Sequence, residues 1–296
     1  MAANQPGIVY GRRVAIVDGL RTPFVKAGTD FKDLSALDLA SGVVGELLQR
    51  SGVAGDRIDR VVFGAVIPDV GAPNIAREVV LAGDMPDTVD AFSVSRACAT
   101  STQAVVSGAQ SILLGDADIV VAGGAESMSK PPILYSDRFV DILMDANAAK
   151  DIGSKVKAFS ALRPKDLAPN PPAIAERSTA LTMGGSAEIM AKENGISREA
   201  QDEYALRSHQ KAVAAWDNGI FDDEVMAFPV GPDYRATVNK DNIPRADSTL
   251  EKLATLRPVF DRKYGTITAG NSSPLTDGAS AVILMEEKTA ERLGFV

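Results

Sequence analysis

The stretch that decides the fold is residues 98–124, which read CATSTQAVVSGAQSILLGDADIVVAGG. Its first part, residues 98–114, has helical spacing, and Gly115 is a suitable stop for a helix. Its last part, residues 118–124, is an apolar run rich in β-branched residues, which predicts a buried strand. The many small residues of the helix indicate close packing on several sides rather than a position on the surface.

Other strand and helix patterns continue this alternation on both sides. Buried strands are predicted over residues 13–18, 60–67 and 279–285, with a further strand starting at Gly265, and a helix over residues 38–49. Such alternation is typical of a layered α/β domain. We therefore expect Ile267 and Val282 to lie in the same sheet as Ile16 and Val120.

The pattern of residue types changes after Ser129. Residues 130–257 carry prolines, loops and charged helical patterns. The clearest helix spans residues 198–218, with Ser197 as its cap and Gly219 as its stop. We expect an α/β core made of residues 1–128 and 258–296, interrupted by a mostly helical insertion of residues 129–257.

Composition excludes several classes of protein. The 296 residues are 45% hydrophobic, which is ample for a buried core, and the formal net charge is −8. An acidic chain without a dense Lys/Arg run is a poor nucleic-acid binder. A single cysteine permits no internal disulfide, and no run reaches the roughly 20 apolar residues of a membrane span. With no leader in residues 1–7, we expect a cytoplasmic protein. No His, Cys or carboxylate cluster has metal-ligand spacing, so we predict no metal.

The only cysteine, Cys98, is the leading candidate for chemistry. The stretch 91–94 leads to it, and a strand or loop feeding a helix would place the thiol at the helix N-terminus. The unpaired N–H groups and the dipole there favour a thiolate nucleophile and can stabilise an oxyanion. The alternative is that Cys98 is a small buried hydrophobic residue.

Five segments together resemble the thiolase family. They are SRACATS (95–101), GGAESMS (123–129), MGGSAE (183–188), SHQKA (208–212) and GTITAGNSSPLTDG (265–278). They follow the family's order and spacing over nearly the whole chain. Residues 72–78 and 256–263 look most like the β-subunit of the fatty-acid-oxidation trifunctional complex and its bacterial counterpart. The resemblance implies a thiolase-like α/β domain with a mixed sheet, and 3-ketoacyl-CoA thiolysis or the reverse Claisen condensation.

The chain also departs from the family. A thiolase has a second, similar half with a Gly-His-Pro histidine, a second cysteine and an oxyanion-hole asparagine. Here the only cysteine is Cys98 and the only histidine is His209. We therefore expect an N-terminal part without the C-terminal thiolase domain. A nucleophile without a base is weak, so this part alone should be nearly inactive.

The resemblance implies roles for further residues. Cys98 would accept the acyl group, and the Ser273 hydroxyl would bind the pantetheine amide of coenzyme A. Met183 would line the pantetheine and acyl tunnel, while Arg245 and Leu256 would touch the adenine and ribose. The alternatives are a turn residue for Ser273, a core residue for Met183 and a solvated face for Arg245. Lys252 stands where the family archetype has a serine.

Two other groups have plainer interpretations. His209 lies on a helix that is polar on most faces, so we expect a surface or packing role rather than catalysis. Arg96 is close to Cys98, and we expect a structural salt bridge rather than a partner of the thiolate. Residues 123–125 lack the lysine and spacing of a phosphate loop, so their glycines should let strand and helix pack closely.

Residues 133–167 are a candidate helical hairpin with an apolar patch and a basic stretch. The patch comprises Phe139, Val140, Ile142, Leu143 and Met144, and the basic residues are Lys150, Lys155, Lys157, Arg163 and Lys165. We expect this hairpin to pack over the acyl tunnel. In membrane-associated trifunctional relatives it could instead touch the bilayer or the α-subunit.

Several functions stay open at this point. The resemblance implies acyl-CoA and CoA as substrates, no cofactor, and a homodimer. The first hypothesis is an acyltransferase of the thiolase type, with a biosynthetic acetoacetyl-CoA-forming thiolase as a variant. The second is a non-catalytic CoA-binding or assembly module that needs another chain. A ketoacyl-synthase-like condensing enzyme is disfavoured, because that group usually lacks the long insertion with Met183-Gly184.

Overall fold

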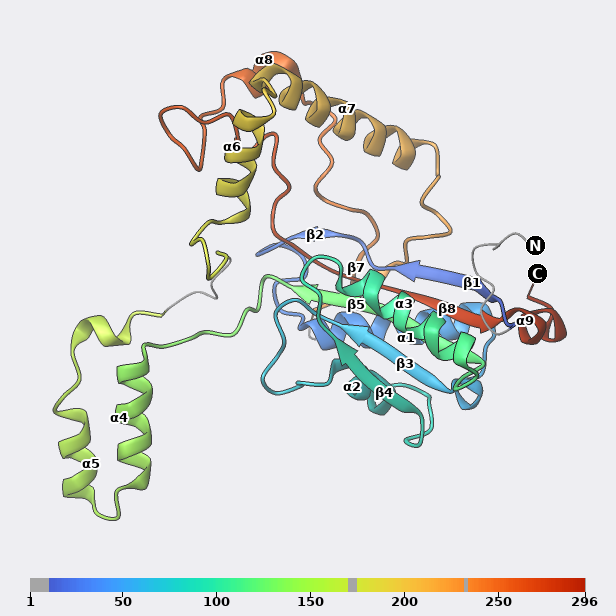
Figure 1. Ribbon diagram of the computed structural model, residues 1–296, viewed down its shortest axis with the longest axis horizontal. Helices are drawn as coiled ribbons and strands as arrows, with labels where there is room; N and C mark the ends of the chain where they lie inside the picture. Colours follow the sequence, from blue (N-terminus) through green and yellow to red (C-terminus); the bar gives the residue numbers. More distant parts are fainter. Residues whose placement is uncertain (1–10, 170–174, 232–233, 296) are drawn as a thin grey trace. The chain divides into compact units, whose positions relative to one another are not determined.

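A computed structural model describes residues 11–169, 175–231 and 234–295 (Figure 1). By its internal contacts the chain divides into two compact units, Met1–Lys130 with Gly184–Val296, and Pro131–Met183. The predicted insertion, residues 129–257, describes the order of segments along the chain, whereas these units describe which residues pack together. The insertion therefore stays a prediction. Each unit is described by itself.

The larger unit is built on a mixed sheet that has six strands within the described residues. The sheet order is β1 (Val14–Arg21), β8 (Thr276–Glu286), β5 (Ile119–Ser127), β3 (Arg60–Gly64) and β4 (Asp90–Val94), with β2 (Val25–Lys26) paired to β8. β3 runs parallel to β4 and β5, whereas β8 is antiparallel to β1 and β5. The predicted α/β class and mixed sheet are confirmed.

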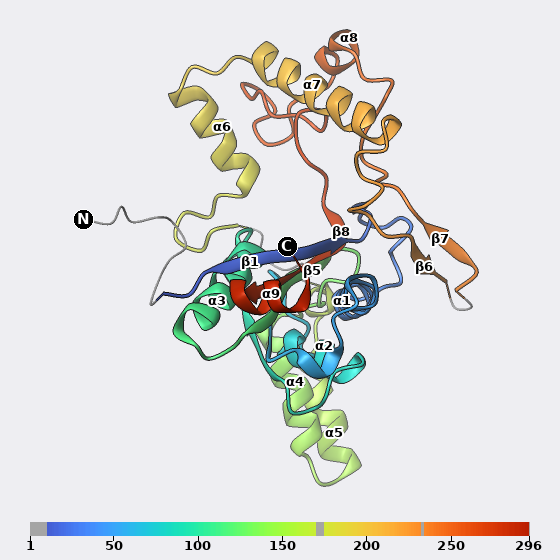
Figure 2. The same ribbon diagram turned by 90° about the vertical axis from the view of Figure 1, so that its right-hand side faces the viewer.

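Alternate side chains of each strand enter two separate cores, as a pleated sheet requires. On one face Phe63 and Ile283 pack with α1 (Ala36–Ser51), α2 (Ile75–Ala82) and α9 (Glu287–Leu293). On the other face Val120 and Leu284 pack with α3 (Thr100–Leu114) in a smaller core. Figure 2 shows α1 and α2 together on their side of the sheet.

The strand predicted from Gly265 is wrong. Residues 265–275 form no strand, and their only ladder contact among the described residues is the bridge between Pro258 and Thr268. The backbone donors there are already used. The Thr266 and Ile267 N–H groups donate to the Glu188 carboxylate, both at 2.9 Å, and the Thr268 N–H donates to Asn271 Oδ1 at 2.7 Å. Ile267 is thus outside the sheet, whereas Val282 pairs with both neighbouring strands as predicted.

The rest of the larger unit consists of short elements and one long helix. They are η1 (Gly55–Arg57), α6 (Met183–Glu193), α7 (Arg198–Asp217), α8 (Leu250–Ala254) and the pair β6 (Phe228–Val230) and β7 (Ala236–Val238). The predicted helix from Arg198 is confirmed. The Ala200 N–H donates to the cap Ser197 at 3.1 Å, and Gly219 follows the helix with φ +69°.

The smaller unit contains the predicted helical hairpin. α4 (Asp137–Ala148) packs against α5 (Ile152–Phe159), and a 3-10 turn, η2 (Pro164–Leu167), follows. Arg138 Nε lies 3.2 Å from the buried Asp166 carboxylate, which ties η2 to α4. No helix among the described residues is long and apolar enough to cross a membrane.

Candidate functional site

Cys98 lies on the turn between β4 and α3. Ala97 before it has φ +45°, a left-handed conformation that non-glycine residues rarely adopt and that is common at functional sites. Thr100 fixes this turn, because its hydroxyl accepts from the Arg96 N–H at 2.8 Å and donates to the Ala97 carbonyl at 2.7 Å. The thiol is free and exposed, so the alternative of a buried hydrophobic residue does not fit.

The turn places Cys98 just before the first helical residue of α3. The N-cap position is Ala99, and no side chain caps it. The first N–H groups of a helix have no partner inside the helix, and together with the helix dipole they favour negative charge. The predicted position of Cys98 at a helix N-terminus is therefore confirmed.

A cavity of about 370 Å³ surrounds Cys98. Its walls include the ends of three adjacent strands: residues 64–66, residues 124–126, and Thr276 with residues 278–280. Gly124 is required here, since a β-carbon would collide with Ser101 Oγ of α3. Gly124 thus allows strand and helix to pack closely beside the cysteine, as the sequence predicted, whereas Gly123 faces the neighbouring strands.

Glu126 at the edge of this cavity is a residue that the sequence analysis missed. Its carboxylate accepts from the backbone N–H of Val66 at 2.7 Å and more weakly from that of Ile67 at 3.4 Å. Burial raises the pKa of Glu126; the two backbone hydrogen bonds oppose the shift, and Asp277 adds to it. The sequence does contain one indication of this residue, because an acidic side chain stands at the end of a predicted buried strand, inside the segment GGAESMS.

Arg96 does not make the predicted salt bridge. Its guanidinium donates to Gln103 Oε1 at 2.6 Å, and among the described residues it has no ion pair with a carboxylate. The reason is local: Gln103 lies one turn into α3, within reach of the side chain.

A second cavity, of about 600 Å³, brings together three of the predicted coenzyme A residues. Arg245, Leu256 and Ser273 all line it, together with Lys26, His209, Lys252, Leu253, Phe260 and residues 268–270. Ser273 is the last residue before Pro274, and its hydroxyl donates to the Pro274 carbonyl at 3.3 Å. Arg245 and Ser273, which are 28 positions apart in the sequence, therefore line the same cavity.

The second cavity is rich in cationic groups. Lys252 Nζ lies 2.9 Å from Asp247, whose pKa it lowers. The Arg245 guanidinium has no hydrogen bond or ion pair within the described part of the chain. The Arg245 backbone N–H donates to His209 Nδ1 at 3.3 Å, and burial and the Arg245 charge lower the pKa of His209. His209 is thus a neutral packing residue of this cavity and does not line the cavity of Cys98.

Met183 is the first residue of α6, and its side chain is 58% exposed. It belongs to the smaller compact unit. Its predicted contact with pantetheine stays a prediction.

Among the described residues, no group of three or more His, Cys, Asp and Glu side chains could hold a metal ion.

The family described as thiolase, N-terminal domain, matches residues 14–288. This chain belongs to the thiolase family. It is 54% identical over 284 residues to the 3-ketoacyl-CoA thiolases of Yersinia pestis (strain Pestoides F) and Yersinia pseudotuberculosis (serotype O:1b, strain IP 31758). The match covers 96% of this chain and 65% of each relative, so the chain spans about two thirds of their length.

A solved structure agrees with the fold of this thiolase-family chain. The crystal structure of the Bacillus anthracis acetyl-CoA acetyltransferase superposes with a TM-score of 0.83 at 34% identity. The superposition covers 96% of this chain and 68% of the Bacillus anthracis chain. The resemblance that the five sequence segments indicated is confirmed.

Proposed function

We propose that this chain supplies the nucleophile and most of the coenzyme A site of a 3-ketoacyl-CoA thiolase. The observation that carries the proposal is the exposed Cys98 beside the N-terminus of α3, in a chain 54% identical to 3-ketoacyl-CoA thiolases. The substrates would be a 3-ketoacyl-CoA and CoA, with no other cofactor. The reaction belongs to fatty-acid β-oxidation.

The chemistry proceeds in two acyl transfers. The Cys98 thiolate attacks the 3-keto carbon, the bond between C2 and C3 breaks, and the acetyl-CoA fragment leaves and takes a proton at C2. The acyl group stays on Cys98 as a thioester. The thiol of CoA, losing its proton, then attacks this thioester, and acyl-CoA leaves while the Cys98 thiolate is restored. Splitting one transfer into two easier steps is the benefit of a covalent nucleophile.

The α3 N-terminus supports the charged species in these steps. The dipole of α3 favours negative charge at this end of the helix. A proton acceptor for the thiols is not present in the described part of the Cys98 cavity, where the one carboxylate, Glu126, is engaged by backbone N–H groups. We infer that the base comes from the part of the relatives that this chain does not match.

The second cavity would hold coenzyme A. Lys26, Arg245 and Lys252 offer positive charge for phosphate groups in a chain that is acidic overall. Leu256 and Phe260 supply apolar surface for the adenine and ribose end. Ser273 would donate to a pantetheine carbonyl, and Met183 would line the pantetheine and acyl tunnel.

Acylation of Cys98 by acetyl-CoA tests the proposal. The chain is incubated with acetyl-CoA, and the acetyl group is located by peptide mass spectrometry. We expect the adduct on Cys98, with steady-state thiolysis near background because the base is absent. Cys98→Ala should carry no adduct yet bind CoA normally. CoA binding without an adduct on Cys98 would favour the alternative, a non-catalytic CoA-binding or assembly module.

The α4–α5 hairpin suggests a partner surface. It exposes large apolar side chains: Val140, Leu143, Met144, Ile152, Val156 and Phe159. Exposed apolar groups in such density mark interaction sites. We propose that this surface contacts the α-subunit of a trifunctional complex, with a bilayer contact as the weaker alternative. Packing over the acyl tunnel, a homodimer and a cytoplasmic location stay predictions from the sequence.

A further inference from the structure

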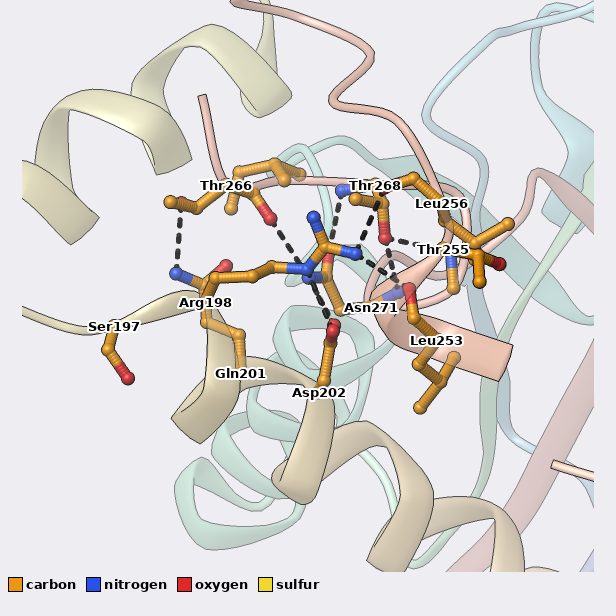
Figure 3. Close-up of polar contacts among 12 residues, drawn as sticks. Ser197, Arg198, Gln201, Asp202, Leu253, Thr255, Leu256, Thr266, Thr268 and Asn271 are labelled. Carbon is orange, nitrogen blue, oxygen red and sulfur yellow. Dashed lines mark hydrogen bonds and ion pairs between the residues drawn. The ribbon is translucent and has the colours of Figure 1, made fainter. Parts of the chain in front are cut away.

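Two of the chain segments that line the second cavity lie outside any sheet. One comprises the end of α8, with Leu253, and the residues just after it, with Leu256; the other is the turn of residues 268–274 that carries Ser273. Neither piece belongs to a sheet, so neither is held by a β ladder. What holds both is a polar network centred on the first turn and a half of α7, drawn in Figure 3.

Asp202 is the centre of this network. It is 4% exposed, and its two carboxylate oxygens have different partners. Oδ2 accepts from Arg198 Nε at 2.8 Å, one helical turn earlier, and Oδ1 accepts from Asn271 Nδ2 at 2.9 Å. A buried carboxylate that is fully engaged in this way is costly to disturb.

Arg198 connects Asp202 to α8. Its Nη2 donates to the carbonyls of Leu253 at 2.7 Å and Leu256 at 3.1 Å. The Leu253 carbonyl also accepts from the Leu256 N–H at 3.0 Å, so the guanidinium reinforces the turn in which α8 ends. Arg198 therefore fixes the backbone of both leucines that face the cavity.

Asn271 connects Asp202 to the 268–274 turn, and all of its amide hydrogen-bonding groups are used. One N–H donates to Asp202, the other donates to the Thr266 carbonyl at 3.0 Å, and Oδ1 accepts from the Thr268 N–H. Figure 3 shows the Asn271 amide between Asp202 and the Thr266–Thr268 backbone. Reversing the amide would place its oxygen against the Asp202 carboxylate, so only one orientation fits.

The turn also approaches the side chains of Leu253 and Leu256, so a larger residue at position 270 would have to push their methyl groups aside. A β-carbon on Gly270 would lie 2.5 Å from Leu256 and 2.6 Å from Leu253. The two walls of the cavity are therefore in direct contact as well as tied to the same carboxylate. A displacement of Asn271 would move Ser273 and the leucines together.

We propose that Asp202 and Asn271 are positioning residues for coenzyme A binding, which act by holding the Ser273 turn and the α8 leucines in one geometry. This inference rests on the proposed function of the second cavity. Neither side chain lines that cavity itself, so the effect on the ligand passes through Ser273, Leu253 and Leu256.

Asn271→Asp tests the proposal through its pH dependence. An ionised aspartate there would face the Asp202 carboxylate and the Thr266 carbonyl, whereas a protonated one has an O–H that can donate to Asp202 as the amide does. The charged groups around the position are Asp202 and Arg198 on α7 and Glu188 on α6, which binds the Thr266 N–H; α8 contributes only carbonyls. Repulsion by Asp202 raises the pKa of the new carboxyl, so lowering the pH restores the fit.

The measurement is the Kd of CoA for the whole 296-residue chain by calorimetry. We expect Asn271→Asp to weaken binding about 10-fold at about pH 8 and to return to within about 2-fold of wild type at about pH 5.5. Because the titration of CoA and of His209 affects variant and wild type alike, their effects cancel when the two Kd values are compared at each pH. Asp202→Asn should weaken binding without this pH-dependent recovery, because no pair of carboxylates is formed.

Two controls separate positioning from general loss of stability. Asp166→Asn removes an equally buried, arginine-paired carboxylate in the smaller unit and should leave the Kd unchanged. Hydrogen exchange of the peptide 266–275 in the ligand-free chain should rise in Asn271→Asp at about pH 8, relative to wild type, and recover at about pH 5.5.

The outcomes are distinct. Equal Kd values and equal exchange in wild type and Asn271→Asp would overturn the inference, as would a loss of binding at every pH shared by Asp166→Asn. If wild type does not bind CoA, the proposed function fails. The exchange measurement then decides the inference, because protection lost and regained with pH supports the anchoring of the turn, and unchanged protection refutes it.

Discussion

The two cavities of the larger unit differ in kind. The Cys98 cavity lies at the ends of β3, β5 and β8 and owes its shape to regular strands. The second cavity lies among α7, α8 and irregular chain and owes its shape to side-chain hydrogen bonds. The first carries Cys98, the proposed nucleophile, and the second carries the cationic side chains proposed to bind coenzyme A. Binding and chemistry should therefore be separable in this chain.

The largest expected effect falls on chemistry alone. In an enzyme that contains this chain together with the part of the relatives that it does not match, Cys98→Ser should reduce thiolysis by several orders of magnitude, because a serine hydroxyl does not ionise near neutral pH as a thiol can. The Kd of CoA should stay at the wild-type value. Steady-state kinetics of acetoacetyl-CoA thiolysis and calorimetry measure the two quantities. A normal rate after Cys98→Ala would refute the thiolase mechanism.

Binding should respond to the second cavity without any effect on the reactivity of Cys98. Arg245→Ala removes a guanidinium that makes no hydrogen bond or ion pair among the described residues, so its N–H groups are available to phosphate. We expect the Kd of CoA to rise roughly 10-fold to 100-fold, since hydrogen bonds to charged groups contribute about 1.5–3 kcal/mol. The effect should shrink at high salt.

Arg57→Ala is a matched control for that experiment. Arg57 is an exposed arginine of η1 and does not line the second cavity. It should leave the Kd unchanged. An equal loss of binding in both variants would mean that overall charge, rather than the second cavity, attracts CoA.

Much of the Cys98 cavity could be predicted from the sequence, and little of the second cavity could. β5, β8 and α3 have clear periodicity, and the turn at Cys98 lies between two such patterns. The turn of residues 265–274 looks like a strand in sequence, because nothing local shows that Glu188 and Asn271 occupy its backbone donors. Arg245, Leu256 and Ser273 were found only through the family resemblance. Glu126 was missed because its role depends on the loop after β3.

Glu126→Gln tests the Cys98 cavity, whose walls include the ends of three strands. Because burial raises the pKa of Glu126, the folded chain retains its proton at pH values where the unfolded chain has released it. The ionised carboxylate therefore costs stability as the pH rises from the unfolded pKa through the folded one. We expect Glu126→Gln to have a higher Tm than wild type at neutral pH, with the difference vanishing near pH 4.

The same variant should have a modest effect on function. Glutamine has one acceptor oxygen, which in the place of Oε2 can still accept from the Val66 and Ile67 N–H groups, but the second contact of Ile67, with Oε1, is lost. We expect Cys98 acylation to slow about 3-fold to 10-fold, the equivalent of about one hydrogen bond, with no change in the Kd of CoA. A Tm below that of wild type at neutral pH would show that the two backbone hydrogen bonds outweigh burial.

The smallest effect is expected at the only histidine. His209 lines the second cavity, where its Nδ1 accepts from the Arg245 backbone, and its lowered pKa keeps it neutral near pH 7. His209→Asn retains an acceptor at about the position of Nδ1, so the Arg245 segment should keep its place. We expect the Kd of CoA to change less than about 2-fold, the equivalent of a few tenths of a kcal/mol, and Cys98 acylation to keep its rate and pH profile. A fall in acylation by orders of magnitude, with the Kd unchanged, would make His209 the base and would end the separation of the two cavities into one for chemistry and one for binding.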